Sequence, residues 1–298
     1  MKSSRITVIT PTYNRANMLP EVIKSLQKQT LQNFDHIIID DGSTDNTKDV
    51  ITPLIKNNKN TQYIYQENAG EAAAVNVGWS LAQTDYVVIV NSDDPQPSNL
   101  LETIVEFMDN HPDVAIGYPD WFKIDENSKV IESVECMDYD RNTILLHGYC
   151  IPGPGAVLRR SALTDITQIR DGRFPTVTDL GCWLVCAAHE KHFKRIPKFV
   201  SNWRSHDEGI TLALKGHKIA KDLYDLYKTF WTENNHAEIN HLKRQSMANI
   251  SLLCVAKTLT APNKKYLSIS YLLKAFCWSP SGTLINIFNR LRKKRYAA

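Results

Sequence analysis

The chain of 298 residues is long enough for one large α/β domain with an appendage, or for two modest domains. Its net charge of +3 and its 43% hydrophobic and 22% charged residues are typical of a soluble globular protein, with no overall signal for nucleic-acid binding. No apolar run approaches the roughly 18 to 20 residues that a membrane span needs. The six cysteines form no CxxC pair and no Cys/His cluster at zinc spacing. With no N-terminal signal peptide, they are predicted to be free thiols of a cytoplasmic protein.

Roughly the first 118 residues alternate between strand-like and helix-like segments. Strands are predicted at residues 5–10, 36–40, 62–65, 87–90 and 114–118, and helices at 18–26, 47–56, 71–82 and 99–110. This alternation predicts an α/β fold, with a mostly parallel twisted sheet that is flanked by helices on both faces. Ligands of such sheets bind at the carboxyl ends of the strands.

The pattern changes near residue 120. Segment 121–135 predicts a hairpin that turns at "ENSK", and the Gly- and Pro-rich "GYCIPGPGAVLRRSAL" leads into a strand at 156–160. A helix at about 180–190 and a strand at 198–204 complete this part. After about residue 215 only helices are predicted, near 217–232, 236–259, 264–277 and 282–295.

Two pairs of carboxylates directly follow predicted strands. Asp40 and Asp41 follow "HIII", and Asp93 and Asp94 follow "YVVIV". Because strand ends meet at one edge of a parallel sheet, both pairs are expected to share a cleft. Adjacent carboxylates repel each other, and a divalent cation, Mg²⁺ or Mn²⁺, is the simplest compensation. A cation with carboxylates suits the handling of a diphosphate, whereas neither a Walker lysine motif nor GxGxxG occurs to hold phosphates.

Three stretches resemble the family 2 glycosyltransferases, which have the GT-A fold: "VITPTYNRANMLPEVIKSLQKQT", "IIIDDGSTDNT" and "NAGEAAAVNVGWSLAQTDYVVIVNSDD". The likeness continues more weakly through "PGPGAVLRRSAL", "TDLGCWLVCA" and "NWRSH" to about residue 210. It implies a GT-A-like domain over 1–215, with a Rossmann-like nucleotide-sugar-binding half (1–120) and an acceptor half (121–215), and a C-terminal helical region over 216–298. It also implies inverting, metal-dependent sugar transfer. The QxxRW motif of processive polysaccharide synthases is absent, which favours adding one sugar at a time.

The resemblance assigns residues to the nucleotide half of the donor. It implies that Pro11, Thr12 and Tyr13 line the nucleotide pocket and that Arg15 lies near the phosphates. Asp41 would accept a hydrogen bond from the N3–H of a uracil ring, a role that suits an ionised acceptor at the pocket floor.

The family's Asp-x-Asp motif falls on Asn91, Ser92 and Asp93. The resemblance implies that Asp93 binds the metal ion bridging the diphosphate, with Asp94 beside it in the donor site. Asn91 replaces the usual first aspartate. Its amide oxygen can still meet a ribose hydroxyl or a metal-bound water, so weaker metal binding is expected rather than none.

Three further residues match family positions. Asn76 is assigned to the donor site, although Val75 before it stands where many relatives have arginine, which puts one phosphate contact in doubt. Asp179 in "TVTDLGCWLVCAA" matches the general base that takes the proton of the acceptor hydroxyl. His206 in "NWRSH" matches a family histidine near the diphosphate, as a metal or phosphate ligand.

Structural roles are the alternatives for many of these side chains. A turn or helix cap is the alternative for Asp40, Asp41, Asp94 and Asp179. A purely structural role is the alternative for His206. The core is the expected place of Trp121, Trp183 and Trp203, and stacking on an acceptor sugar is the alternative.

The predicted C-terminal helices pair apolar residues with a basic end. "NRLRKKRYAA" carries five basic residues and no acidic one, which suits an anionic surface. One interpretation is an interfacial helix in contact with a membrane. The other is a helix that packs on the catalytic domain and leaves a solvated basic tail.

Together these features predict an inverting glycosyltransferase that moves a sugar from a nucleotide-sugar, a UDP-sugar, to a glycan or lipid-linked acceptor in surface polysaccharide synthesis. The expected location is cytoplasmic, with peripheral contact to the inner face of the membrane through the basic C-terminus, and no nucleic-acid partner. One alternative is a sugar-1-phosphate nucleotidyltransferase, which would want a Gly-rich phosphate loop near the N-terminus. The other is a catalytically inactive nucleotide-sugar-binding protein, which Asn91 makes conceivable.

Overall fold

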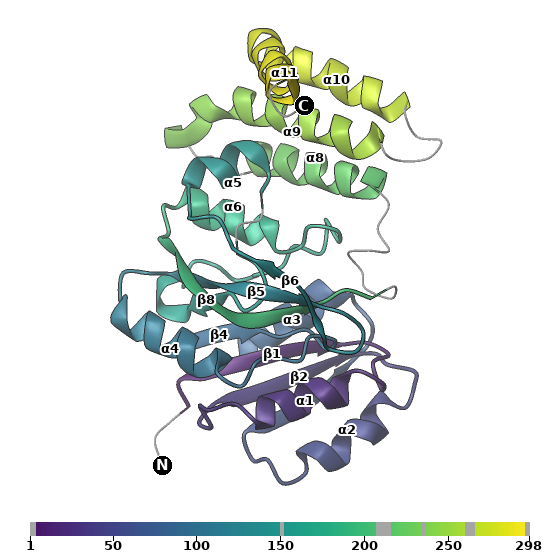
Figure 1. Cartoon of the computed structure of the whole chain (residues 1–298), viewed down its shortest axis with the longest axis vertical. Coiled ribbons are helices and arrows are strands. Elements are labelled where there is room, and N and C mark those ends of the chain that lie inside the picture. Colours follow the sequence, from purple (N-terminus) through teal and green to yellow (C-terminus); the bar gives the residue numbers. More distant parts are fainter. Residues whose placement is uncertain (1–3, 150–151, 207–215, 234–236, 260–265, 296–298) are drawn as a thin grey trace. The chain divides into compact units, whose positions relative to one another are not determined.

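The computed structural model describes residues 4–149, 152–206, 216–233, 237–259 and 266–295, with side chains described up to residue 287. The chain divides into two compact units (Figure 1). The first comprises residues 1–139, 151–172 and 191–209, and the second comprises 140–150, 173–190 and 210–298. Segments 140–150 and 173–190 therefore belong to the second unit, although the pattern along the chain groups them with residues 1–215.

One mixed sheet forms the centre of the first unit. Its strands are β1 (Ile6–Thr12), β2 (Asp35–Asp41), β3 (Thr61–Gln66), β4 (Tyr86–Ile89), β5 (Ile116–Ile124), β6 (Val130–Val134), β7 (Val157–Arg159) and β8 (Phe193–Arg204). The strand order is β3-β2-β1-β4-β7-β5-β6, and β8 pairs with β5. Strands β1 to β4 are parallel, as predicted, and β5 and β6 form the predicted hairpin.

Strand β7 lies between β4 and β5 and is antiparallel to both. Its residues follow the Gly- and Pro-rich segment. The order of elements along the chain did not reveal this insertion, because β7 is only three residues long and pairs with strands far away in sequence.

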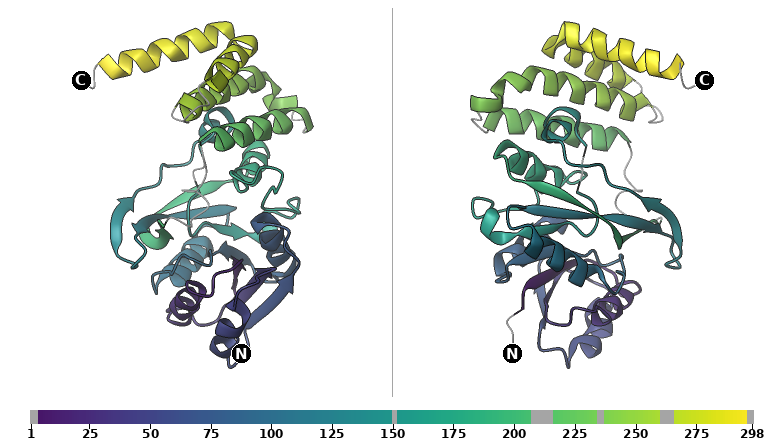
Figure 2. Two further views of the ribbon diagram at one scale, coloured as in Figure 1. Left: turned by 90° about the vertical axis from the view of Figure 1, so that its right-hand side faces the viewer. Right: turned by 60° about the vertical axis from the view of Figure 1, so that its left-hand side comes forward.

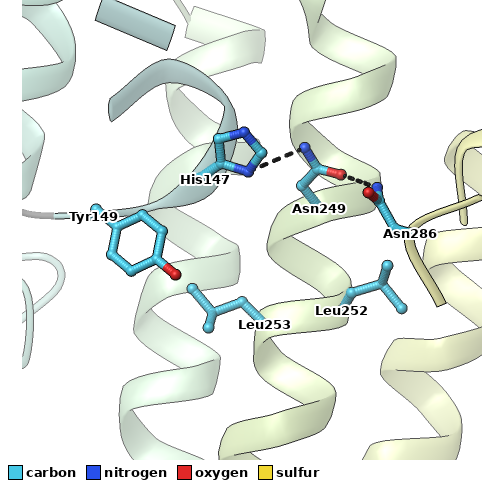
Figure 3. A pocket seen from close by; sticks show the side chains of 6 residues that line it. All are labelled: His147, Tyr149, Asn249, Leu252, Leu253 and Asn286. Carbon is cyan, nitrogen blue, oxygen red and sulfur yellow. Dashed lines mark hydrogen bonds between the residues drawn. The ribbon is translucent and has the colours of Figure 1, made fainter. Parts of the chain in front are cut away.

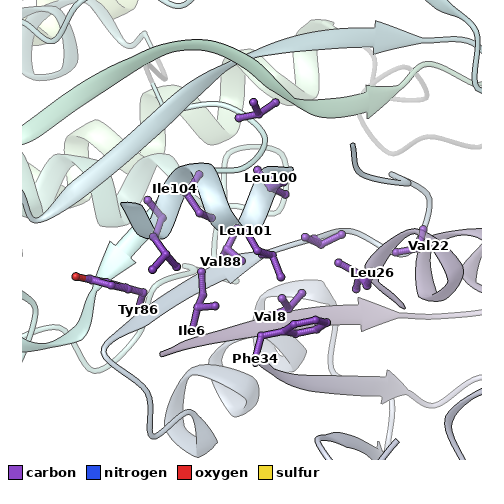
Figure 4. Packing of buried hydrophobic residues seen from close by; sticks show 14 of the residues in the cluster. Ile6, Val8, Val22, Leu26, Phe34, Tyr86, Val88, Leu100, Leu101 and Ile104 are labelled. Carbon is purple, nitrogen blue, oxygen red and sulfur yellow. The ribbon is translucent and has the colours of Figure 1, made fainter. Parts of the chain in front are cut away.

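Four helices flank the sheet of the first unit: α1 (Leu19–Gln27), α2 (Thr47–Ile55), α3 (Glu71–Leu81) and α4 (Leu100–Asn110). On one face of the sheet, Ile6 and Val8 of β1 and Val88 of β4 pack against α1 and α4 (Figure 4). On the other face, Ile37 and Ile39 of β2 pack with α3. Successive side chains of a strand point to opposite faces, so strands covered on both faces are continuous apolar runs. Each fully buried side chain of this kind contributes about 1.5–3 kcal/mol.

Helices make up the described part of the second unit: α5 (Arg141–His147), α6 (Leu180–Ala188), α8 (Gly216–Glu233), α9 (Lys243–Leu259), α10 (Tyr266–Trp278), α11 (Pro280–Arg295) and a 3₁₀ turn at Ala237–Leu242. Helices α8, α9 and α10 stack in chain order (Figure 2). The helical C-terminal region is thus confirmed. Among the described residues, no helix is both long enough and apolar enough to cross a bilayer.

Helix α5 is the helix that the sequence analysis missed. Asp140 caps its start, with Oδ1 accepting a hydrogen bond from the backbone N–H of Asn142 at 3.0 Å. Gly148 ends it in the left-handed region, with a φ of 69°. Both are recognised boundary signals, and they were available in "DRNTILLHG". Periodicity gave no help because the helix has only seven residues.

A small cavity of about 50 Å³ lies in the second unit, beside α5, α9 and α11 (Figure 3). The Nδ2 group of Asn286 donates to Oδ1 of Asn249 at 2.7 Å, and Nδ2 of Asn249 lies 3.5 Å from Nδ1 of His147. Tyr149 and two leucines line the rest of the cavity. None of these residues belongs to the predicted site, and the amide pair links α11 to α9.

Candidate active site

The loops after β1 and β2 are joined by one asparagine. Asn14 has a φ of 51°, and its Oδ1 accepts hydrogen bonds from the backbone N–H groups of Thr44 (2.8 Å) and Asp45 (3.3 Å). Its own N–H donates to Oγ of Ser43 at 2.9 Å. Asparagine is one of the few residues that adopt this left-handed conformation readily. The two loops thus form one wall at the carboxyl edge of the sheet, through a residue that the sequence analysis did not single out.

Asp41 lies at the end of β2 and is buried. One oxygen accepts hydrogen bonds from Nε2 of Gln66 (2.7 Å) and the N–H of Ala69 (2.9 Å), and the other accepts from the N–H of Gly70 (2.8 Å). An ionised carboxylate offers about four acceptor positions. Three are used by Gln66 at the end of β3 and by the loop before α3, which fixes the orientation of the carboxylate and leaves one position for a further donor.

The neighbouring Asp40 has the turn role that the sequence left open. Its Oδ1 accepts the backbone N–H of Ser43 at 2.8 Å, and its Oδ2 accepts the hydroxyl of Tyr63. Burial, followed by the hydrogen bond to Asp40, raises the pKa of the Tyr63 hydroxyl. Asp40 therefore stabilises the turn after β2, while Asp41 binds the 66–70 segment.

The residues assigned to the nucleotide pocket differ in exposure. Pro11 and Thr12 are buried at the end of β1, whereas the side chain of Tyr13 is exposed. Arg15 is fixed through its backbone, whose N–H donates to Oγ1 of Thr47 at 3.0 Å. The exposed tyrosine ring and the loop joined by Asn14 thus stand on the same edge as Asp41.

Asp93 and His206 converge although they are 113 positions apart in the chain. Nε2 of His206 lies 3.1 Å from Oδ2 of Asp93, and the side chains are 5% and 20% exposed. Nδ1 of His206 is buried and has no hydrogen-bond partner in the described part of the chain. Within those same residues, no group of three or more His, Cys, Asp or Glu side chains could hold a metal ion by itself. The structure thus brings together the two residues that the resemblance assigns to the metal.

Asp94 is buried and bonds to groups other than His206. Its Oδ1 accepts the backbone N–H of Arg204 at 2.6 Å, and its Oδ2 accepts Nδ2 of Asn91 at 3.0 Å. Burial, with a smaller contribution from the charge of Asp93, raises the pKa of the Asp94 carboxyl to about 8. Asp94 therefore fastens the loop after β4 to the end of β8. Ser92 is also buried, and Asn91 is exposed with its amide nitrogen engaged by Asp94.

Gln96 is a second residue that holds the loop after β4 against β8, and the sequence analysis missed it. Its Nε2 donates to the carbonyl of Asp94 at 2.8 Å, and its Oε1 accepts from Oγ of Ser201 (2.9 Å) and the N–H of Asn202 (3.1 Å). These bonds position the loop that carries Asp93 against the strand that leads to His206. No local motif predicts this role, because Ser201 and Asn202 lie more than 100 residues away in the chain.

Asn76 is engaged by the protein itself. Its Oδ1 accepts the backbone N–H groups of Ile169 (2.9 Å) and Arg170 (3.1 Å), and its Nδ2 donates to the carbonyl of Arg170 (2.9 Å). Arg170 in turn lies 3.5 Å from Glu71, the first residue of α3. Asn76 therefore holds segment 169–170 against α3, and its assignment to the donor stays a prediction.

Asp179 directly precedes α6 in the second unit. Its backbone is helical, and its side chain makes no capping hydrogen bond. Asp179 thus occupies the N-cap position, with its carbonyl accepting the N–H of Trp183 at 3.2 Å, but without the side-chain hydrogen bond of a typical cap. Its role as the base stays a prediction.

Two tryptophans form a partly exposed cluster on β5 and β8. The rings of Trp121 and Trp203 meet edge to face, with centroids 6.0 Å apart, and Nζ of Lys123 lies 5.7 Å from the Trp203 ring. Lys123 pairs directly with Trp203 in the sheet, so the three side chains share one face. Trp203 immediately precedes the residue whose N–H holds Asp94. Trp183, by contrast, is buried, as expected for the core.

Comparison with known proteins gives a consistent result. The family model described as Glycosyl transferase family 2 matches residues 7–167. TuaG of Bacillus subtilis (strain 168), a putative teichuronic acid biosynthesis glycosyltransferase, is 31% identical over 187 residues, which cover 60% of this chain and 70% of TuaG. The alignments to the first two curated relatives span only 22% and 42% of the length of those proteins.

Two solved structures have the same fold. The structure of S. aureus TarS 1–349 in complex with UDP-GlcNAc matches with a TM-score of 0.66 and 18% identity, over 92% of this chain and 81% of TarS. The mannosyltransferase PcManGT from Pyrobaculum calidifontis, in complex with GDP-Man and Mn²⁺, matches with a TM-score of 0.63 and 16% identity, over 98% of this chain and 81% of that chain. At these identities the likeness shows the fold, which confirms the predicted GT-A-like sheet with C-terminal helices.

Proposed function

The chain belongs to glycosyl transferase family 2, and we propose that it transfers a sugar, with inversion, from a UDP-sugar to a hydroxyl of a glycan or lipid-linked acceptor. A role in surface polysaccharide assembly is suggested by the likeness to TuaG. The family match favours a transferase over the nucleotidyltransferase alternative. The observation that carries the proposal is the convergence of His206 with Asp93, which follows β4 in the same parallel sheet in which Asp41 ends β2.

The Asp93–His206 pair fits a divalent cation. One carboxylate and one imidazole are ligands that Mn²⁺ accepts, and such ions usually take their remaining ligands from substrate phosphates and water. A bound cation would neutralise charge on the diphosphate leaving group. The pair is held for this purpose by the chain itself, because Gln96 and Asp94 tie the Asp93 loop to the end of β8.

The nucleotide base fits the edge formed by Asp41 and Tyr13. The carboxylate of Asp41 retains one acceptor position, which suits the N3–H of uracil. The exposed ring of Tyr13 offers a flat surface on the same edge. An ionised acceptor favours a ring with an N–H at this place, as uracil has.

Inverting transfer needs a base on the acceptor side, and we assign this role to Asp179. The carboxylate takes the proton of the acceptor hydroxyl. At the same time the oxygen of that hydroxyl forms the new bond to the anomeric carbon. The bond from that carbon to the diphosphate breaks, and its electron pair leaves with the diphosphate. Asp179 directly precedes α6, in the segment that the family resemblance assigns to the base.

The tryptophan cluster of β5 and β8 supports a glycan acceptor. Aromatic rings present apolar faces on which the C–H groups of a sugar ring can pack, and Lys123 adds a donor for a hydroxyl. Trp203 directly precedes Arg204, whose backbone N–H binds Asp94 in the loop that carries Asp93. We further propose that the basic C-terminus makes peripheral contact with a membrane, where a lipid-linked acceptor would be found.

Calorimetry with UDP, with and without Mn²⁺, tests this function. We expect Mn²⁺ to strengthen binding of UDP by roughly tenfold or more, and expect the Asp93→Asn variant to lose this gain while keeping its melting temperature. Asp41→Asn should weaken UDP binding with or without the metal. Asp85→Asn, at the opposite end of β4, is the matched control and should behave as wild type.

Retention of the Mn²⁺ effect in Asp93→Asn would overturn the assignment of the metal. Release of UDP from UDP-sugars in the presence of Mn²⁺ separates an active transferase from an inactive nucleotide-sugar-binding protein, since only the active enzyme turns the donor over.

A further inference from the structure

The outward face of α10 is apolar. Tyr266, Ile269 and Leu273 are 61%, 63% and 61% exposed. Their spacing of three and then four residues places them in one stripe along the helix, and Cys277 continues the stripe as an exposed residue. Large apolar side chains scattered singly on a surface need no explanation, but a continuous stripe of them indicates a binding partner.

The inward face of the same helix is smaller and more polar. Its buried residues are Ser268, Tyr271 and Ala275. Oγ of Ser268 lies 2.8 Å from Oγ1 of Thr258 on α9. A surface helix of a globular protein normally buries its apolar stripe and exposes its polar one. Helix α10 departs from this pattern, because the stripe of Tyr266, Ile269 and Leu273 is not used in its packing within the described chain.

The exposed apolar surface extends to α11. Leu284 and Ile285 are 59% and 60% exposed. The helix is attached through polar contacts, in which Oγ1 of Thr283 donates to the carbonyl of Ala275 (2.9 Å) and Asn286 donates to Asn249 (2.7 Å, Figure 3). Both helices thus use hydrogen bonds on the inside and leave aliphatic side chains outside.

The charge of this part of the chain is of one sign. Residues 239–298 contain eleven Lys and Arg and no Asp or Glu. The other 238 residues carry all 32 acidic side chains and 24 basic ones, a formal net charge of −8. An anionic surface would therefore attract the C-terminal segment and repel the remainder, which favours contact through this segment.

We propose that the outer faces of α10 and α11 bind an anionic lipid bilayer, with Tyr266, Ile269 and Leu273 entering the headgroup region. Interfacial helices combine such an apolar stripe with basic residues, and they lie with the apolar side chains about 5–10 Å deep. The proposal deepens the peripheral contact proposed above, which named only the basic C-terminus, by assigning the side chains that enter the lipid. A second copy of the chain is a poorer occupant, because a symmetric dimer through this face would bring two acid-free, cationic segments together.

Vesicle flotation tests the assignment. The probe is a vesicle of 70% phosphatidylcholine and 30% phosphatidylglycerol, compared with a vesicle of phosphatidylcholine alone. Wild type should float with the anionic vesicles at low salt and lose binding as salt rises. The triple variant Tyr266→Ser, Ile269→Ser, Leu273→Ser should bind roughly tenfold or more weakly. Its matched control is Val130→Ser, Ile131→Ser, Met137→Ser, which removes three exposed apolar side chains of the first unit.

Two further readouts separate the outcomes. The triple variant should keep its melting temperature and its Mn²⁺-dependent binding of UDP, so a failure of the donor site is seen apart from a failure of this face. Equal flotation of the triple variant and wild type would overturn the proposal. So would a wild-type protein that does not float and sediments as a dimer that the triple variant dissociates, because a second copy would then cover the face.

Discussion

The two units bury different kinds of polar side chain. Among the described residues, the buried Asp, Arg and His side chains all belong to the first unit: His36, Asp40, Asp41, Asp94, Asp120, Arg204 and His206. The buried polar side chains of the second unit are hydroxyls and one amide: Ser246, Asn249, Ser251, Thr258, Ser268 and Thr283.

This difference has a physical reason. Burying a charge is costly unless it is paired, so a fold keeps buried charges where a site or a network uses them. In the second unit, Oγ of Ser246 donates to the carbonyl of Leu145 at 2.7 Å, which is a buried bond between neutral groups. Neutral bonds do not respond to pH. The stability of the first unit should therefore depend on pH. Because the described part of the second unit buries no Asp, Arg or His, few of its groups should contribute to catalysis.

Removing the proposed base, Asp179, should have the largest effect on the rate of transfer. It tests whether a group of the second unit contributes to catalysis. Asp179→Asn keeps the shape and the oxygen of the side chain and removes its basicity. We expect the rate of sugar transfer to fall by about 10² to 10⁴, because general-base assistance has this value, with near-normal melting temperature and UDP binding. Steady-state kinetics of UDP release with acceptor measure it.

Glu190→Gln, just beyond the other end of α6, is the control for this variant and should transfer at the wild-type rate. Transfer within a few-fold of wild type in Asp179→Asn would exclude the residue as the base. A collapsed melting temperature would show that the side chain has a structural role.

Breaking a buried ion pair of the first unit should have the next largest effect. Asp120 is 2% exposed and accepts Nε (2.8 Å) and Nη2 (2.6 Å) of Arg195. Burial alone would raise the pKa of the Asp120 carboxyl, but the bonds from Arg195 and from the Cys136 backbone lower it overall. Arg195→Met should reduce the free energy of unfolding by about 3 kcal/mol, because it leaves a buried charge unpaired. Urea denaturation at neutral pH measures the change.

The sign of the pH dependence follows from the lowered pKa of Asp120. The contribution of the pair is present above about pH 4 and is lost as the pH falls further, since protonation removes the charge that Arg195 stabilises. The double variant Arg195→Met, Asp120→Asn should recover part of the loss. A double variant no more stable than Arg195→Met would contradict the unpaired charge as the cause.

A buried histidine should make the first unit sensitive to mild acid. His36 on β2 is buried, and Nε2 lies 3.0 Å from Oγ1 of Thr10. Burial lowers the pKa of His36 from 6.5 to about 3. The unfolded chain therefore binds a proton below pH 6.5 that the folded chain does not, so stability falls as the pH drops from 6.5 towards 3. At pH 5 the loss from this group is about 2 kcal/mol.

Urea denaturation at pH 7.5 and pH 5 measures this loss, and His36→Gln should remove most of the difference. His241→Gln, an exposed position of the second unit, should leave the difference unchanged. An unaltered pH dependence in His36→Gln would show that other groups cause it.

The smallest effect should come from a cation in the second unit. Nζ of Lys274 lies 4.1 Å from the ring centroid of Tyr224 and 4.7 Å from that of Tyr271. Lys274→Gln should reduce the free energy of unfolding by about 0.5–1 kcal/mol, equally at pH 5 and pH 7.5, because it removes a cation from two aromatic rings and breaks no buried ion pair. Lys274→Arg keeps a cation over the rings and should be near neutral. A loss of unfolding free energy that differs between pH 5 and pH 7.5 would contradict the expectation that only the first unit depends on pH.

The sequence predicted the elements well because their apolar residues recur regularly. The buried strand ending in Val90 and the helix that carries Leu100 and Ile104 are examples, since both are apolar on the faces that the sheet covers. The position of β7 could not be predicted, because strand order depends on pairing between distant segments. Helix α5 was predictable only from its ends, Asp140 and Gly148.

The candidate site was predictable by resemblance and only partly by chemistry. Adjacent carboxylates after a strand indicated a charged site, but they did not show that Asp93 meets His206 while Asp94 turns inward. That difference depends on the N–H of Arg204, a backbone group that every sequence has. The engagement of Asn76 with segment 169–170 is likewise a tertiary contact that no local pattern encodes.

The asparagine that joins the loops after β1 and β2 bears on how mutational maps of this protein should be interpreted. Position 14 makes two demands: a left-handed backbone and an acceptor for two amides. Glycine meets the first demand and fails the second, while most other residues fail the first. A scan of all substitutions should therefore find few tolerated at Asn14. Its profile would resemble that of a catalytic residue, although its evident task is architectural, so intolerance to mutation alone does not identify the groups that touch the donor.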